Sequence, residues 1–242
     1  KTMRAVWKRE LQAFFYTPIG YVFMGFFLLV SGYFFWGYNI SSGSSDMTNF
    51  FSQVTYIFVM FVPVLTMRLM SEERRNKTDQ LLITSPMSIT SIIVGKFLAA
   101  ASVLLITLVI TFIYPTIIAV YGRLTFGTLF TNYLGFFLLG CVYISIGLLM
   151  STLCENQVTA AVVTLVVNIM LQVLEYVPSM LSSGSYFSFI GNLFGWLSLN
   201  SRNSDFAAGL LSFSNILYFI SFVAVVLFLS VRVVERRRWS EG

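Results

Sequence analysis

The residues that carry out nucleophilic or metal-assisted catalysis are scarce in this sequence. None of the 242 residues is His, which excludes Ser-His-Asp and Cys-His nucleophile systems and His-ligated zinc. Cys141 and Cys154 form neither a CxxC motif nor a disulfide framework. Glu155 and Glu175 lie at opposite ends of one apolar run, so they do not make an acid–base pair. The sequence also lacks a GxxxxGK[ST] phosphate-binding loop. An intramembrane enzyme is therefore disfavoured, and any ATP hydrolysis is expected on another chain.

One charged interior stretch offers a different kind of chemistry, the docking of a partner protein. Ser71 can cap a helix, and the acidic residues after it suit the positive end of a helix dipole. Leu81 and Leu82 add an apolar patch, and Pro86 disfavours helix at the residue before it. The stretch predicts a short helix over 71–86 that is charged on one side and apolar on the other, with an ordinary basic loop as the equally weighted alternative. Its residues are Ser71-Glu72-Glu73-Arg74-Arg75-Asn76-Lys77-Thr78-Asp79-Gln80-Leu81-Leu82-Ile83-Thr84-Ser85-Pro86.

The elements that hold this stretch are long apolar runs. The chain is 57% hydrophobic and only 10% charged, with a mean hydropathy of +0.82, whereas an average soluble domain is about 25% charged. A spanning helix needs about 20 apolar residues, and the lipid interior requires every backbone group to be paired internally. We therefore expect an all-α integral membrane protein, a single domain over 1–242. The uncharged runs predict six transmembrane helices at about 19–38, 51–70, 92–121, 129–153, 157–177 and 214–233.

The positions of Lys and Arg predict the orientation of these six spans. Of the 15 basic residues, all but Arg123 and Arg202 fall on one side if both ends of the chain lie together. Basic residues gather on the cytoplasmic side of membrane proteins, so both termini are predicted to be cytoplasmic. Anionic lipid explains the basic excess, and no nucleic-acid partner is expected.

The connections at the two ends of the chain carry further predictions. Residues 1–17 form an amphipathic helix, ended by Pro18, that is expected to lie at the membrane interface or to serve as a plain juxtamembrane anchor. Residues 178–213 are too long and too apolar for a structureless loop, so short re-entrant helices are expected there before the last span. The interfacial anchor residues of the first helix are Trp7, Arg4, Lys8 and Arg9.

Four stretches of the sequence resemble those of bacterial ABC-2 type transporter permeases. The pattern S-E-E-R-R-x-K-T-x-x-L-L-x-T-S-P with the later G-K-F-L resembles the family signature, although Lys77 and Gln80 replace its usual Gly and Glu. The N-terminal R-A-V-W-K-R-E-L-x-A-F-F-x-x-P-I-G-Y resembles the family's interfacial elbow helix. The stretches S-L-N-S-R-N-S-D-F-A-A-G and V-x-x-V-E-R-R-R-W resemble the gliding-motility-type subgroup.

This resemblance implies a permease subunit of an ATP-binding-cassette transporter in the bacterial plasma (inner) membrane, with export the expected direction. It implies two cytoplasmic ATPase subunits, a second identical or related permease, and room for an accessory subunit with an outer domain. ATP and Mg would bind the ATPase, and no cofactor is expected on this chain. The helix at 71–86 would be a cytoplasmic coupling helix that docks on the ATPase through Glu72, Glu73, Arg74, Arg75, Lys77, Thr78, Leu81 and Leu82.

Two polar stripes inside the spans are candidates for a substrate path or a subunit interface. Polar side chains within spans are costly and face protein or water. Interhelical hydrogen bonding and ordinary packing are the alternative explanations. The stripes consist of Gln53, Tyr56, Met60 and Pro63 in the second span, and Gln157, Thr164, Asn168, Gln172 and Glu175 in the fifth. A membrane anchor or mechanical scaffold of an ATPase-driven envelope complex remains the alternative function.

Overall fold

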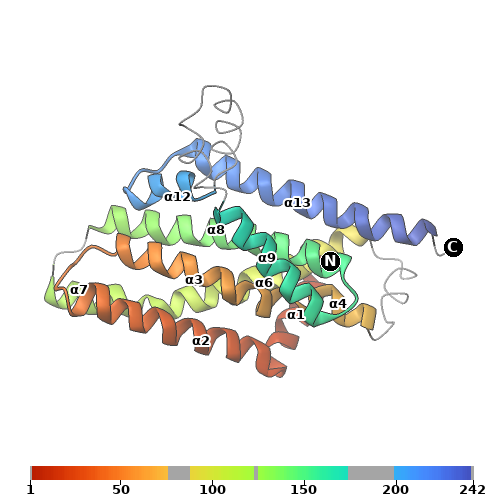
Figure 1. Cartoon of the computed structure of the whole chain (residues 1–242), viewed down its shortest axis with the longest axis horizontal. Coiled ribbons are helices and arrows are strands. Elements are labelled where there is room, and N and C mark those ends of the chain that lie inside the picture. Colours follow the sequence, from red (N-terminus) through yellow and green to blue (C-terminus); the bar gives the residue numbers. More distant parts are fainter. Residues whose placement is uncertain (1, 76–87, 123–124, 174–198, 241–242) are drawn as a thin grey trace.

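The structure, a computed structural model, describes residues 2–75, 88–122, 125–173 and 199–240 (Figure 1). Within these ranges the chain forms helices joined by turns, with no β-strand. The helices are α1 (Thr2–Tyr16), α2 (Pro18–Phe35) with the π-helical turn η1 (Trp36–Ile40), α3 (Thr48–Thr66), α4 (Arg68–Arg75), α6 (Ile89–Thr111), α7 (Ile113–Tyr121), α8 (Phe126–Leu153), α9 (Gln157–Val173), α12 (Leu199–Ala207) and α13 (Phe213–Ser240).

Five helical segments of the described chain are long and apolar enough to cross a membrane. They are Pro18–Ile40, Thr48–Arg75, Ile89–Tyr121, Phe126–Leu153 and Phe213–Arg236, and they coincide with five of the six predicted spans. The predicted span 157–177 corresponds to α9, whose 17 residues make a helix of about 25 Å. That is shorter than a hydrocarbon core of about 30 Å, and residues 174–177 lie outside the described chain.

The helices run lengthwise in alternating directions (Figure 1). The helix α9 starts at the end of the molecule where α4 lies, whereas α13 starts near the opposite end, and both chain termini lie toward the α4 end. The central helix is α8, which packs against α3, α6, α9, α12 and α13. The last helix, α13, covers one side of the bundle and leaves large apolar side chains such as Phe213, Leu217 and Phe228 exposed.

Aromatic rings fill the space between α2, α3 and α8. The Phe58 ring of α3 lies 5.9 Å from Phe27 of α2 and 5.1 Å from Phe136 of α8, measured between ring centroids. Phe23 of α2 and Tyr143 of α8 extend the same cluster at 6.4 and 6.5 Å from Phe58. Edge-to-face and tilted contacts at such separations stabilise a core beyond the burial of apolar area alone.

Pro115 divides the third span into α6 and α7. Proline has no backbone N–H, so the carbonyl of Thr111, four residues earlier, loses its usual donor within the helix. The Tyr133 hydroxyl of α8 donates to that carbonyl at 3.1 Å. A proline in a spanning helix is tolerated where a neighbouring helix pairs the freed backbone group, and Tyr133 provides that partner.

One predicted element differs from the observed one, and another is described only in part. The predicted start of the cytoplasmic helix at Ser71 is wrong, because α4 begins at Arg68 as a continuation of the second span and Ser71 is buried inside it; residues 76–87 lie outside the described chain. The described part of the predicted re-entrant region 178–213 contains the short helix α12 and the first residue of α13. Residues 178–198 lie outside the described chain.

The predicted N-terminal amphipathic helix is present as α1, and its apolar face packs on α6. The Trp7 indole N–H donates to Ser102 Oγ at 3.0 Å, and Val6 approaches so closely that a Cβ at Gly95 would lie 2.9 Å from its Cγ1. Arg4 and Lys8 are exposed on the other face. The first helix is therefore attached to the bundle through Trp7 and Val6, and the interfacial role of its basic residues stays a prediction.

Candidate functional site

The charged residues at the end of the second span form an ion-pair cluster with α1 and α6. Lys96 of α6 is almost fully buried, and its Nζ lies 2.9 Å from Glu73 Oε1 of α4 and 3.3 Å from Glu10 Oε1 of α1. Arg9 of α1 lies 2.8 Å from Glu10 and 3.4 Å from Glu73. We call Arg9, Glu10, Glu73 and Lys96 the charge cluster. It joins three helices that are distant in sequence.

Electrostatics within the charge cluster stabilise the ionised form of Glu10. Burial on its own would raise the pKa of the Glu10 carboxyl, but the Lys96 ammonium and the Arg9 guanidinium together hold this pKa below its ordinary value. The hydrogen bond from Arg9 to Glu10 in turn raises the pKa of the Arg9 guanidinium. A buried lysine would be strongly unfavourable alone, and the two carboxylates compensate its charge.

Arg74 connects α4 to the turn between α8 and α9. Its guanidinium donates to the Leu153 carbonyl at 3.1 Å and to Glu155 Oε1 at 2.6 Å. The Leu153 carbonyl lies at the C-terminal end of α8, where backbone acceptors lack partners within the helix. A cation there is favoured by the helix dipole. Arg74 therefore links α4 to the α8–α9 turn at the same end of the molecule.

Arg68, the first residue of α4, reaches the corner between α1 and α2. Its guanidinium donates to Thr17 Oγ1 at 2.6 Å and lies 5.7 Å above the Phe14 ring. On its own helix, Arg68 pairs with Glu72 at 3.0 Å. Thus α4 has polar contacts with α1, with the α1–α2 corner, with α6 and with the α8–α9 turn.

The predicted docking residues therefore separate into two groups. Glu73 and Arg74 face other helices of the same subunit, whereas the Arg75 side chain is exposed and Glu72 is partly exposed. Lys77, Thr78, Leu81 and Leu82 lie outside the described residues. Within the described chain, Arg75 and Glu72 are the predicted docking residues that a partner can reach.

The predicted polar stripe of the fifth span faces the interior of the subunit. Thr164 and Asn168 of α9 are fully buried, and Thr164 donates to Ala160 in its own helix. Gln157 and Gln172 are partly buried, and Glu175 lies outside the described residues. The exposed side of α9 is apolar, with Val158, Val162 and Met170 at its surface.

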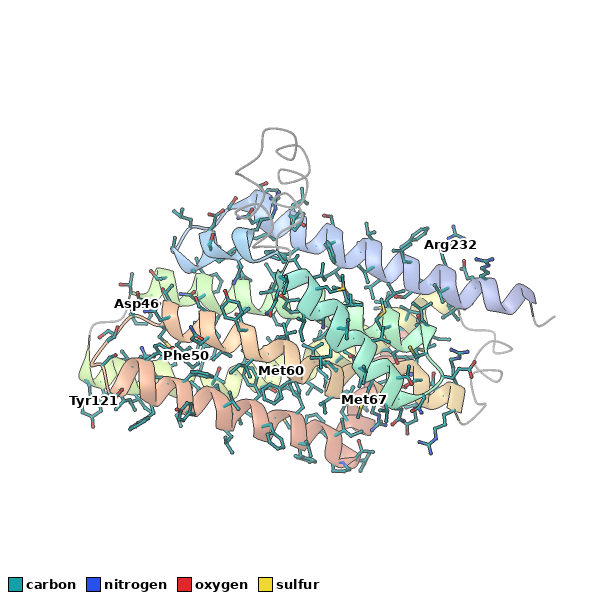
Figure 2. All side chains as sticks on the ribbon, viewed as in Figure 1. Asp46, Phe50, Met60, Met67, Tyr121 and Arg232 are labelled. Carbon is teal, nitrogen blue, oxygen red and sulfur yellow. The ribbon has the colours of Figure 1, made fainter. Side chains whose placement is uncertain are left out.

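The predicted stripe of the second span is divided between surface and interior. Tyr56 and Met60 are 39% and 60% exposed, Gln53 is partly buried and Pro63 is buried. Figure 2 labels Met60 midway along α3. The structure thus leaves the middle of this stripe, Tyr56 and Met60, accessible from outside the subunit. It does not bring this stripe and the polar side of α9 into one exposed surface.

Several residues of this site had no role in the sequence predictions. Glu10 and Lys96 each border an uncharged run. This position indicates that each charge needs an oppositely charged partner, but the sequence does not identify that partner. Ser151 of α8, which hydrogen-bonds to the start of α4, has no recognisable signal beyond being a small polar residue in a span. Among the described residues, no group of three His, Cys, Asp or Glu side chains is placed to hold a metal ion.

Comparison with known families settles the class of this membrane protein. Residues 37–232 match the family described as ABC-2 family transporter protein. The chain belongs to the ABC-2 family. No curated protein matches the sequence significantly. The match begins after α1 and α2, covers α3 to α12 and extends to residue 232 of α13, and it includes α4 with three of its attachment points on α6, α8 and the α8–α9 turn.

Family membership makes this chain a permease subunit of an ABC transporter, a multi-pass membrane protein of a family that works with ABC ATPases. Members of this family are membrane components of transporters and generally not catalysts. The similarity to the gliding-motility-type subgroup stays a prediction.

Proposed function

We propose that this ABC-2 permease is an exporter subunit of the bacterial plasma membrane that receives force from a separate ATPase through α4. It crosses the membrane six times, with α9 in the fifth crossing, and both termini lie in the cytoplasm. A second identical or related permease completes the transmembrane unit, and two ATPase subunits bind below. ATP and Mg bind the ATPase subunits.

The observation that carries this proposal is the set of contacts made by α4. A segment that transmits force must be attached to the elements that it moves, because packed helices respond as rigid bodies. The helix α4 continues a spanning helix and is linked by Glu73 to α1 and α6 and by Arg74 to the end of α8. A displacement of α4 would therefore reach three helices besides its own.

The exposed side of α4 provides the docking group that the proposal needs. Arg75 is the last residue of α4 and is exposed, directly before the segment predicted to enter the ATPase. Charged groups at the rim of an interface govern orientation and association rate. Arg75, with Glu72 beside it, is therefore the described residue whose charge should matter most for ATPase recruitment and least for folding.

Co-purification tests this proposal. The chain is purified from its native membrane in mild detergent, with crosslinking to retain weak partners, as wild type, as Arg75→Glu and as Arg236→Glu. Arg236 is an exposed arginine of α13, so it controls for an identical charge change on another helix. The proposal predicts a stoichiometric ATPase with the wild type and Arg236→Glu and less ATPase with Arg75→Glu. Absence of any ATPase from all three samples would contradict it.

A further inference from the structure

The second span is interrupted at Met67, where it meets the cytoplasmic end. Helix α3 ends at Thr66 and α4 begins at Arg68, and the N–H of Met67 closes α3 by donating to Pro63 at 2.8 Å. The first four N–H groups of a helix have no acceptor within it. In α4 these include Met70 and Ser71, which are buried and out of reach of water.

A hydroxyl from the neighbouring helix occupies this interruption. Ser151 Oγ of α8 accepts from the N–H of Met70 at 3.0 Å and from the N–H of Ser71 at 3.1 Å. The same hydroxyl donates to the Met67 carbonyl at 3.2 Å. A serine hydroxyl has one donor and two acceptor sites, so all of its hydrogen-bonding capacity is spent on the backbone of the α3–α4 junction.

Close packing directly above the junction holds the two helices in contact. Thr66, the last residue of α3, packs on Gly147 of α8 so tightly that a Cβ at Gly147 would overlap the threonine side chain. Gly147 lies one helical turn before Ser151, so both residues are on the same side of α8. The contact places the serine hydroxyl within reach of the junction, and Thr66 and Ser151 are both fully buried.

We propose that Met67 is a hinge between the second span and α4, and that Ser151 is the positioning residue that sets the resting angle of this hinge. A side chain inserted between successive turns is a recognised cause of helix kinks. The hydroxyl of Ser151 takes the place of backbone acceptors at the junction. Therefore α4 can tilt against α3 while the N–H groups of Met70 and Ser71 exchange the serine hydroxyl for backbone carbonyls. This inference deepens the proposed function, in which α4 is the element that the ATPase displaces.

Amide hydrogen exchange of the purified permease tests the hinge without any ATPase. In Ser151→Ala the amides of Met70 and Ser71 lose their acceptor, and their exchange should rise by about tenfold. Ser145→Ala is the matched control, since Ser145 is equally buried in α8 but donates to Val142 of its own helix. The control should leave residues 67–72 unchanged. If Ser151→Ala does not accumulate, Ser151→Cys, with a weakly accepting sulfur, takes its place and should give a smaller rise.

A second measurement uses the complex with the co-purified ATPase, with and without a non-hydrolysable ATP analogue. The hinge predicts that nucleotide changes the exchange of Met70 and Ser71 in the wild type and that this change is lost in Ser151→Ala. Unchanged exchange in the isolated Ser151→Ala variant, or a bound ATPase whose nucleotide response leaves residues 67–72 unaffected, would overturn the hinge. Failure to recover an ATPase would instead count against the proposed function, because the first measurement does not involve one.

Discussion

Lys96 and Glu73 form a buried ion pair, with 2.9 Å between Nζ and Oε1, that joins the start of the third span to the end of the second. The lysine side chain is 2% exposed and the glutamate 16% exposed. Such a pair contributes little net stability when both members are present, but removal of one member leaves an uncompensated charge. This asymmetry makes the pair testable.

Lys96→Met should destabilise the permease by about 3 kcal/mol, because Glu73 and Glu10 would remain close together with only Arg9 to balance them. Thermal unfolding in detergent measures the effect. The double variant Lys96→Met/Glu73→Gln removes both charges and should recover part of the lost stability. A double variant less stable than Lys96→Met would contradict this account of the pair.

The stabilisation supplied by Glu10 should depend on pH. Its pKa in the folded protein is lowered by Lys96 and Arg9, so its contribution is complete above the ordinary glutamate value of about 4.3 and is lost as the pH falls through the lowered pKa. The difference in Tm between wild type and Glu10→Gln should therefore be constant from about pH 8 to pH 5 and shrink on further acidification. A difference that grows on acidification would contradict the assigned charge contacts.

The Tyr133 hydroxyl should matter because of Pro115. Tyr133→Phe removes the donor to the Thr111 carbonyl and should cost about 1–2 kcal/mol of unfolding free energy. Pro115→Ala restores a backbone N–H that can pair this carbonyl, so Tyr133→Phe should cost less in that background. A double-mutant cycle measured by unfolding in detergent gives the coupling, and equal costs in both backgrounds would refute the link.

Gly20 should tolerate no side chain at the corner between α1 and α2. A Cβ there would lie 2.6 Å from the Phe14 backbone oxygen, so Gly20→Ala must displace α1, at a cost of about 1–3 kcal/mol. Gly25→Ala is the control, since on the same helix its Cβ would meet nothing within 4 Å. A lower Tm for Gly20→Ala and an unchanged or higher Tm for Gly25→Ala are expected.

The uncharged runs made the spanning helices predictable, because lipid demands both length and internal hydrogen bonding. The start of the helix at 71–86 was not predictable in the same way. Serine is a residue type that often caps helices, yet Ser71 is buried inside α4, where the second span continues. Tertiary packing decides whether such a serine begins a helix or lies within one. The family resemblance predicted the class of transporter correctly, through stretches that the sequence carries in order.

The contacts of the candidate site were beyond sequence reasoning for a different reason. Glu73 is a charged residue in a charged stretch and was therefore predicted to dock a partner. Only the fold shows that Lys96 and Arg9 lie next to it. Such pairs join residues that are far apart in the chain, so no local spacing encodes them. The same holds for Ser151, whose hydrogen bonds go to backbone groups of α4, which any residue type could present.

The aromatic cluster around Phe58 has a consequence for where a cargo can travel. Rings from α2, α3 and α8 lie in contact along the middle of the bundle, and a protein interior packed in this way has no room for a molecule to pass. Two cavities among the described residues, of about 630 and 350 Å³, lie at the end opposite α4, around Asp46 and Tyr121. A conduit across the bilayer would therefore have to bypass this aromatic cluster rather than run between α2, α3 and α8.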